Sequence, residues 1–412
     1  MQKQVSLLAP VGSFESLQAA INSKADAVYF GVEQLNMRTR SSYPFSIKDL
    51  KQIKSICKKA GIRCYLTLNT VMYEHDMQLL RNILKETQKQ KIDAVIASDF
   101  AVLELCRQMN IPVHISTQAN ISNLESVIFF SKYADVMVLA RELTLVQVKK
   151  ITDAIKRKKI KGPSGELVQI EIFIHGALCM AISGKCYLSL HAQNASANRG
   201  ACVQNCRRAY EVTDKESGEA LVIENEYIMS PKDLCTIDIL DQVIACGVAV
   251  LKIEGRTKGA DYVQTVTNCY REAIEAVHYG TYNAHKIEQW KKQLATVYNR
   301  GFWEGYYLGR KMGEWTPHPG SAATEKKIYI GKGSKYYPKI GVGEFIIESG
   351  KLKTGDHIMI TSTHCGMVKE KLNSLIVNGS EQTTAEKGDK ITFPFATKVT
   401  ASDKMYKIIA DG

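Results

Sequence analysis

Short apolar runs alternate with amphipathic stretches along the first 256 residues. The apolar runs are near-continuous and rich in β-branched side chains, as in strands covered on both faces. The stretches between them carry apolar residues at 3.6-residue spacing and begin after Ser or Asn residues that can cap a helix. We expect strands over Val5–Pro10, Asp26–Val32, Arg63–Asn69, Asp93–Ser98, Val113–Gln118, Asp135–Ala140, Glu171–Gly176 and Val250–Gly255. We expect helices over Phe14–Ser23, Ile47–Ala60, His75–Gln90, Phe100–Met109, Asn123–Tyr133 and Thr144–Lys158.

This order of strands and helices, joined by short links, predicts a parallel sheet. Eight strand units in roughly 280 residues predict an α/β fold, a TIM-like (β/α)8 barrel. A doubly wound open sheet is the alternative architecture. No GxGxxG motif follows the first strand, which argues against a dinucleotide-binding sheet.

The alternation breaks between the seventh and eighth strands, over residues 177–249. A loop of this length inside a compact domain is usually functional. In a barrel, the loop after a strand opens on the C-terminal face, where catalytic residues gather. We therefore expect this insertion to lie at the mouth of the barrel.

The chain changes character after a long expected helix, Gly259–Tyr279. Short alternating runs punctuated by Gly and Asp begin near Lys326 and predict a small antiparallel β-barrel. We divide the chain into a catalytic barrel domain (1–297), a connector (298–325) and a C-terminal β-barrel domain (326–412).

The charge balance favours a polyanionic partner such as nucleic acid, because the 412 residues carry a formal net charge of +12. A merely basic enzyme would carry the same excess. No run of 18 apolar residues occurs, so no membrane span is expected. The first twelve residues do not read as a signal peptide, and we expect a cytoplasmic protein.

Four of the 11 cysteines fall close together, at Cys179, Cys186, Cys202 and Cys206. Their C-x6-C-x15-C-x3-C spacing is a poor zinc pattern, since zinc sites favour close CxxC-type pairs. Four thiolates suit an iron–sulfur cluster, whose ligand spacings vary more. The competing interpretation is that these are inert, buried cysteines.

Neighbouring residues fit the cluster interpretation. Gly184 and Gly200 can supply the turns that wrap a chain around a cluster. Nearby cationic side chains are expected to lower the pKa values of the thiols; they are Lys185, Arg199, Arg207 and Arg208. Cys235 is the substitute fourth ligand if Cys206 is not one. The number of ligands, three with an open iron site or four, stays open.

Polar residues at the ends of the expected strands would ring the barrel mouth. They are Asn69, Asp99, Gln118, Arg141, His175, Glu254 and Arg256. Among them we expect Arg141, His175, Glu254 and Arg256 to be catalytic. No HExxH motif is present, which argues against a metalloprotease. A cysteine protease would need a Cys–His pair, and His175 with Cys179 would leave three thiols unexplained.

The stretch Glu171–Ser189, with its His-Gly pair and C-x6-C, resembles the signature of the collagenase-like peptidase family U32. Leu8–Gly12, Ala25–Gly31 and Val250–Arg256 are also similar to segments of that family. The resemblance covers nearly the whole chain, and the final segment is similar to the family's C-terminal β-barrel domain.

The resemblance implies a [4Fe-4S] cluster, because the better-understood members are RNA or quinone-pathway hydroxylases that carry one. The chain looks most similar to the prephenate-dependent branch that makes 5-hydroxyuridine at the wobble position of tRNA. That branch implies the tRNA anticodon loop as partner and prephenate as co-substrate. Arg141 and Arg256 are suited to the carboxylates of prephenate; the competing interpretation is that they form ion pairs with Glu142 and Glu254. The alternatives are a collagenase-like peptidase, a ribosomal-RNA cytidine hydroxylase, and an iron–sulfur RNA-binding protein without turnover.

Overall fold

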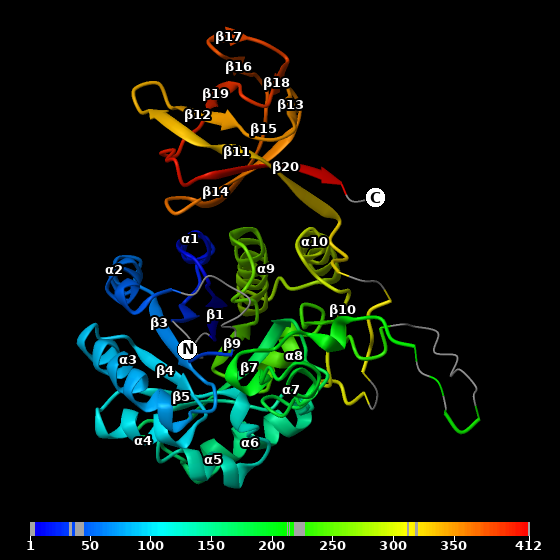
Figure 1. Ribbon diagram of the computed structural model, residues 1–412. Helices are drawn as coiled ribbons and strands as arrows, with labels where there is room; N and C mark the ends of the chain where they lie inside the picture. The colour runs from blue at the N-terminus through cyan, green and yellow to red at the C-terminus, as the bar shows by residue number, and fades with distance from the viewer. Residues whose placement is uncertain are drawn as a thin grey trace.

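The computed structural model describes residues 5–32, 35–37, 45–211, 213, 215–217, 227–310, 313–317 and 320–410. Eight parallel strands form the centre of the larger domain (Figure 1). They are β1 (Ser6–Pro10), β2 (Ala27–Gly31), β3 (Arg63–Leu68), β4 (Ala94–Ala97), β5 (Val113–Ile115), β6 (Val136–Val138), β7 (Gln169–Gly176) and β9 (Val250–Ile253). From β1 to β7 each strand pairs with the next. Strand β9 pairs with both β7 and β1, so the sheet closes.

This closed ring confirms the predicted (β/α)8 barrel and excludes the open sheet. Amphipathic helices follow the strands and cover the outside of the ring (Figure 1). They are α1 (Phe14–Asn22), α2 (Leu50–Lys59), α3 (Met77–Lys89), α4 (Phe100–Gln108), α5 (Leu124–Phe130), α6 (Leu145–Lys158), α8 (Leu240–Ala245) and α9 (Ala260–His278). Side-chain caps fix several starts, as where Ser13 accepts a hydrogen bond from the amide of Ser16.

Local hydrogen bonding moves some predicted boundaries. The expected strand Val113–Gln118 ends at Ile115, because Ser116 caps a 3₁₀ turn, η3 (Thr117–Ala119). Two expected helices begin with separate 3₁₀ turns, η1 (Ile47–Asp49) and η2 (Glu74–Asp76).

The insertion after β7 is a mixture of short elements. It contains α7 (Leu188–Gln193), η4 (Ala197–Arg199), η5 (Asn205–Arg207) and β8 (Asp233–Cys235). Strand β8 pairs antiparallel with the end of β7, and β10 (Phe302–Trp303) then pairs with β8. Part of the predicted insertion, residues 212, 214 and 218–226, lies outside the described residues.

The C-terminal segment forms antiparallel sheets, as predicted, above the barrel in Figure 1. Its strands are β11 (Glu325–Tyr337), β12 (Val342–Ile347), β13 (Lys351–Lys353), β14 (His357–Ser362), β15 (Gly366–Lys371), β16 (Ile376–Val377), β17 (Ser380–Glu381), β18 (Thr384–Glu386), β19 (Lys390–Pro394) and β20 (Lys404–Ala410). Helix α10 (Ala284–Ala295) precedes the first of them. A separate apolar core, with stacked Phe345 and Phe393 at its centre, holds these sheets together.

The C-terminal domain docks on the outer helices α1 and α9. The Asn22 side chain donates to the carbonyl of Cys365, and Gln264 exchanges two hydrogen bonds with the backbone of Met367. Within the described residues, no helix is both long and apolar enough to cross a membrane.

Gly366 allows a close approach between the two domains. It has a φ of +70°, and a Cβ there would lie 2.6 Å from the amide nitrogen of Ala19. Gly355 has a φ of +94° with no described atom within 4 Å of its Cβ position.

We predict that Gly366→Ala lowers stability by about 1–3 kcal/mol more than Gly355→Ala, because only the first adds an overpacked contact to backbone strain. Thermal unfolding of the two variants measures the difference. Equal losses would show that the domains do not meet at Gly366.

Candidate functional site

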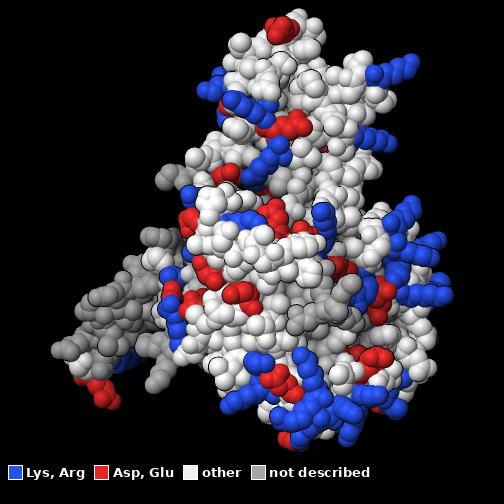
Figure 2. Space-filling view, turned by 180° about the vertical axis from the view of Figure 1, so that it is seen from behind, with Lys and Arg blue, Asp and Glu red and all other residues white. Residues whose placement is uncertain are grey.

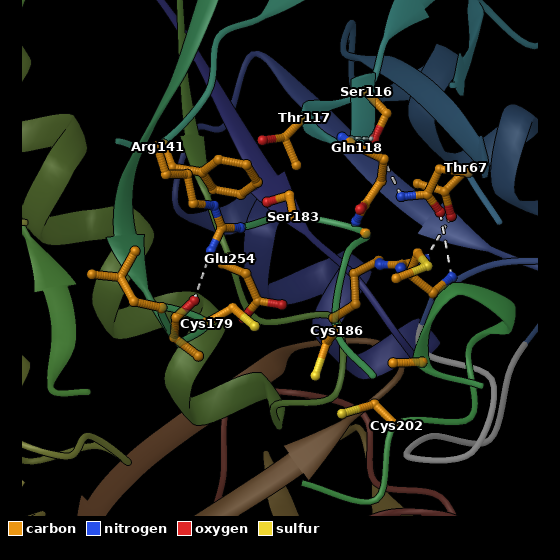
Figure 3. Close-up of a pocket in the computed structure, with 18 of the residues that line it drawn as sticks. Thr67, Ser116, Thr117, Gln118, Arg141, Cys179, Ser183, Cys186, Cys202 and Glu254 are labelled. Atoms are coloured by element: carbon orange, nitrogen blue, oxygen red, sulfur yellow. Dashed lines mark hydrogen bonds between the residues drawn. The ribbon is translucent and has the colours of Figure 1, made fainter. Parts of the chain in front are cut away.

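A pocket of about 170 Å³ opens at the C-terminal ends of the barrel strands (Figure 3). Its walls come from strands that are far apart in sequence and from the insertion after β7. It is lined by Tyr29, Met37, Thr67, Asn69, Ile96, Ser116, Thr117, Gln118, Arg141, Phe173, Ala177, Leu178, Cys179, Ser183, Gly184, Cys186, Ala197, Asn198, Cys202, Gln204, Cys206, Arg207, Lys252, Glu254, Arg256 and Arg300. The barrel topology thus brings the predicted mouth residues and the predicted cysteine loop to one place.

All four predicted cysteines, Cys179, Cys186, Cys202 and Cys206, line this pocket, and none is in a disulfide. Figure 3 shows the thiols of the first three on the same side of the cavity. Among the described residues, no three His, Cys, Asp or Glu side chains are close enough to hold a single metal ion. A four-iron cluster needs its thiolates farther apart than one ion does, since each thiolate binds a different iron. The donor set therefore fits a cluster by its chemistry and by its shared pocket.

The cysteine loop is fastened to the barrel between its second and third thiols. Arg199 forms an ion pair with Asp76 and donates to the carbonyl of Val71. The amide of Val71 in turn donates to the carbonyl of Asn198. Gly200 has the positive φ (+82°) that the sequence predicts for a turn.

Gly184 also has the positive φ (+72°) that the sequence predicts for a turn. A Cβ at Gly184 would lie 2.5 Å from Oε1 of Gln118, so the loop can approach the barrel only because this residue is glycine. Asn120 adds a further tie, because its side chain donates to the carbonyl of Ser183.

Burial affects the pKa values of two of the four thiols. Burial raises the pKa of Cys206, and Arg207 lowers it only in part. Burial likewise raises the pKa of Cys186. Arg207 therefore acts on Cys206 in the predicted direction, although burial outweighs it. Arg199 is paired with Asp76.

Arg207 also holds the loop in place. Its guanidinium donates to the carbonyls of Leu178 and Pro231 and to the hydroxyl of Ser230. Its positive charge still lies beside the thiols, where it can offset the negative charge of a cluster.

Three of the four predicted catalytic residues line the pocket: Arg141, Glu254 and Arg256. The guanidinium of Arg141 stacks on the Phe173 ring at 3.9 Å and donates to the carbonyl of Ala177. Within the described part of the chain, Nε of Arg141 has no hydrogen-bond partner. Arg256 donates to Thr67 and to Asn36, so its position is fixed.

The structure places His175 outside the pocket. Its side chain is buried with Tyr270 and Tyr262, and burial lowers its pKa to about 3. Cys235, the substitute ligand, lies in the same buried layer and accepts a hydrogen bond from Tyr270. Of the other predicted mouth residues, Asn69 and Gln118 line the pocket, whereas Asp99 caps α4.

The main feature that sequence reasoning missed is a buried ion pair at the pocket floor. Nζ of Lys252 lies 2.6 Å from Oε1 of Glu171, whose side chain is completely buried. Lys252 also faces the rings of Tyr29 and Phe173. A usable signal was present, because Lys252, Glu254 and Arg256 occupy every second position and so point to one side of a strand.

The charges of this pair depend on each other. Burial by itself raises the pKa of Glu171, but Lys252 and His114 outweigh it and hold that pKa below its ordinary value. Burial lowers the pKa of Lys252, and Glu171 opposes the shift. The carboxylate therefore keeps a cationic side chain at the base of the pocket.

The model of "Peptidase family U32" matches residues 12–317 of the chain. The chain belongs to family U32. This U32 protein is 54% identical over 401 residues, 97% of each chain, to a protein of Porphyromonas gingivalis named "Collagenase". It is 33% identical to "tRNA hydroxylation protein P1" of Bacillus subtilis, over 74% of this chain and 72% of that one. It is 35% identical to "23S rRNA 5-hydroxycytidine C2501 synthase" of Escherichia coli, over 66% of this chain and 40% of that one.

We predict that Glu171→Gln lowers the free energy of unfolding by about 3–5 kcal/mol, because it leaves the Lys252 ammonium buried without a carboxylate. Asp153→Asn, which breaks an exposed pair with Lys149, is the control and should cost under about 1 kcal/mol. Denaturant titration at neutral pH measures both. A similar small loss in the two variants would contradict a charged pair in the barrel.

Proposed function

We propose that this U32 protein is an iron–sulfur enzyme that hydroxylates the wobble uridine of tRNA to 5-hydroxyuridine, with prephenate as co-substrate. The observation that carries the proposal is the shared pocket of four free cysteines and the polar residues of the barrel mouth. A [4Fe-4S] cluster bound by Cys179, Cys186, Cys202 and Cys206 would supply electron transfer or activation of the oxygen donor at this pocket.

The chain's own cationic residues would bind the small acid. Arg141 is oriented by the Phe173 ring and the carbonyl of Ala177, which leaves its Nε–H for a ligand. A guanidinium binds a carboxylate through directional, charge-assisted hydrogen bonds. Arg256 and Lys252 add positive charge on the strand side of the same pocket. Five cationic side chains line the pocket, against one carboxylate, that of Glu254.

The overall charge supports a polyanionic substrate. Figure 2 shows Lys and Arg side chains gathered mainly on the lower, barrel part of the molecule. Their phosphate contacts would hold the tRNA, and an unpaired anticodon-loop base can be turned out into a pocket at low cost. With tRNA as its substrate, the protein would act in the cytoplasm.

Relatives of this chain carry two kinds of name, hydroxylase and collagenase. The pocket favours the first, because no histidine lines it among the described residues. His175 is buried with a pKa of about 3 and contacts Tyr270 rather than a pocket thiol. A cysteine protease needs a thiol and an imidazole facing the substrate together.

We predict that Ala at any of the four pocket cysteines removes or strongly reduces iron and acid-labile sulfide, together with the broad visible absorbance of the anaerobically purified protein. Cys106→Ala and Cys235→Ala are matched controls, because both thiols are buried away from the pocket. Loss of iron from Cys235→Ala but not Cys206→Ala would reverse the choice between these two ligands. A wild-type protein without iron and sulfide would contradict the proposal.

We predict prephenate-dependent 5-hydroxyuridine in tRNA treated with the anaerobically purified enzyme, detected by nucleoside mass spectrometry. Arg141→Lys should raise KM for prephenate about ten-fold or more, because it loses the stacked, directional carboxylate contact. Ribosomal RNA and a collagen peptide serve as parallel substrates. Hydroxycytidine in the first, or cleavage of the second without tRNA modification, would contradict the proposal.

A further inference from the structure

Besides Nε of Arg141, three polar atoms of the pocket wall lack partners among the described residues. Oγ1 of Thr117, Oε1 of Gln118 and Oδ1 of Asn198 are buried, and none has a hydrogen-bond partner among the residues that the structure describes. Thr117 as a whole is only 6% exposed. All three residues line the pocket. Buried polar atoms are nearly always hydrogen-bonded, so a group of three at one cavity indicates a ligand that supplies the missing partners.

Two of these atoms, on Thr117 and Gln118, belong to a turn that is held rigidly, whereas Asn198 lies in η4 of the cysteine loop. Ser116 caps the η3 turn by accepting from the amide of Gln118. Asn120 closes the turn by donating to the carbonyl of Gln118, and it also donates to the carbonyl of Ser183 on the cysteine loop. Gln118 is packed against Gly184 of that loop. The turn is thus fixed between the barrel and the loop, as expected for a preorganised recognition element.

The two sides of the cavity have different chemistry. In Figure 3, Ser116, Thr117 and Gln118 lie in the upper half, and Cys179 and Cys186 lie below them. A molecule between the two sides would face thiols on one side and hydrogen-bonding groups on the other.

The types of the unpaired atoms restrict the ligand. The amide oxygens of Gln118 and Asn198 only accept hydrogen bonds, whereas the Thr117 hydroxyl can donate or accept. A carboxylate or phosphate offers only acceptors, so it can pair with the Thr117 hydroxyl but with neither amide oxygen. Uracil offers an N3–H donor flanked by two carbonyl acceptors, so it can pair with the hydroxyl and with one of the two amide oxygens.

We infer that Thr117, Gln118 and Asn198 form the recognition site for the polar edge of a pyrimidine base, here the target uridine. The N3–H donates to an amide oxygen of the site, and a ring carbonyl accepts from the Thr117 hydroxyl. The inference rests on the proposed function and adds the residues that select the base.

Thr117→Val tests the inference, because it keeps the shape of the side chain and removes only the hydroxyl. Thr267→Val is the matched control: Oγ1 of Thr267 is also buried without a partner in the described chain, but it lies in α9 and outside the pocket. Removing an unsatisfied buried hydroxyl should leave the unfolding temperature unchanged or raised in both variants.

We expect Thr117→Val to lower kcat/KM for tRNA about ten-fold while its iron content and visible absorbance stay at the wild-type level. Thr267→Val should keep wild-type kcat/KM. Gln118→Met should lose activity in the same way as Thr117→Val. Wild-type kcat/KM in both pocket variants, or loss of iron from Thr117→Val, would overturn the inference.

A binding measurement separates this inference from the proposed function. Fluorescence anisotropy compares a labelled anticodon stem-loop with the same RNA carrying an abasic site at the target position. The wild type should bind the abasic RNA about ten-fold more weakly, and Thr117→Val should bind both alike. Equal binding of the two RNAs by the wild type would overturn the inference. An absence of 5-hydroxyuridine despite base-dependent binding would overturn only the proposed hydroxylation.

Discussion

The closure of the barrel by β9 is the constraint on which the site depends. β9 pairs with β1 on one side and with β7 on the other, so the first and seventh strands are held a fixed distance apart. The C-terminal ends of eight strands then surround one opening. The loop after β7 begins at this opening, and its four cysteines line the pocket there. The thiols and the polar mouth residues share one pocket because backbone pairing of β9 with β1 and β7 closes the barrel.

A buried ion pair lies at the base of this opening, beside an apolar cluster that includes Tyr29 and Ile96. The ion pair between Lys252 and Glu171 crosses from β9 to β7, the two strands that complete the ring. A buried charge is costly unless it is paired, so each of these residues makes the other necessary. The result is a cationic floor beneath the thiols, with aromatic faces of Tyr29 and Phe173 beside it.

The cysteine loop is attached at several separate points around the mouth. Arg199 fastens it to the turn after β3, Asn120 to the turn after β5, and Arg207 to the backbone near β7 and β8. A loop held in this way can place thiols accurately without a regular element of its own. Relatives of this chain carry names for two activities. The pocket of this chain contains thiols, cations and amides, and the described histidines lie elsewhere.

The sequence alone determined the barrel strands to within a few residues, because strands buried on both faces are read from continuous apolar runs. It also determined the cysteine cluster and its place after the seventh strand, since both depend on order along the chain. Tertiary structure decided which polar residues share the pocket. The pocket is lined by Asn69, Gln118, Arg141, Glu254 and Arg256. His175 is equally near a strand end, but it lies in a buried layer with Cys235 because β8 pairs with the end of β7. The Lys252–Glu171 pair could not be predicted from the sequence, because its two residues meet only when β7 and β9 pair. The unpaired atoms of Thr117 and Gln118 face a shared pocket only because the closed ring brings distant strands together.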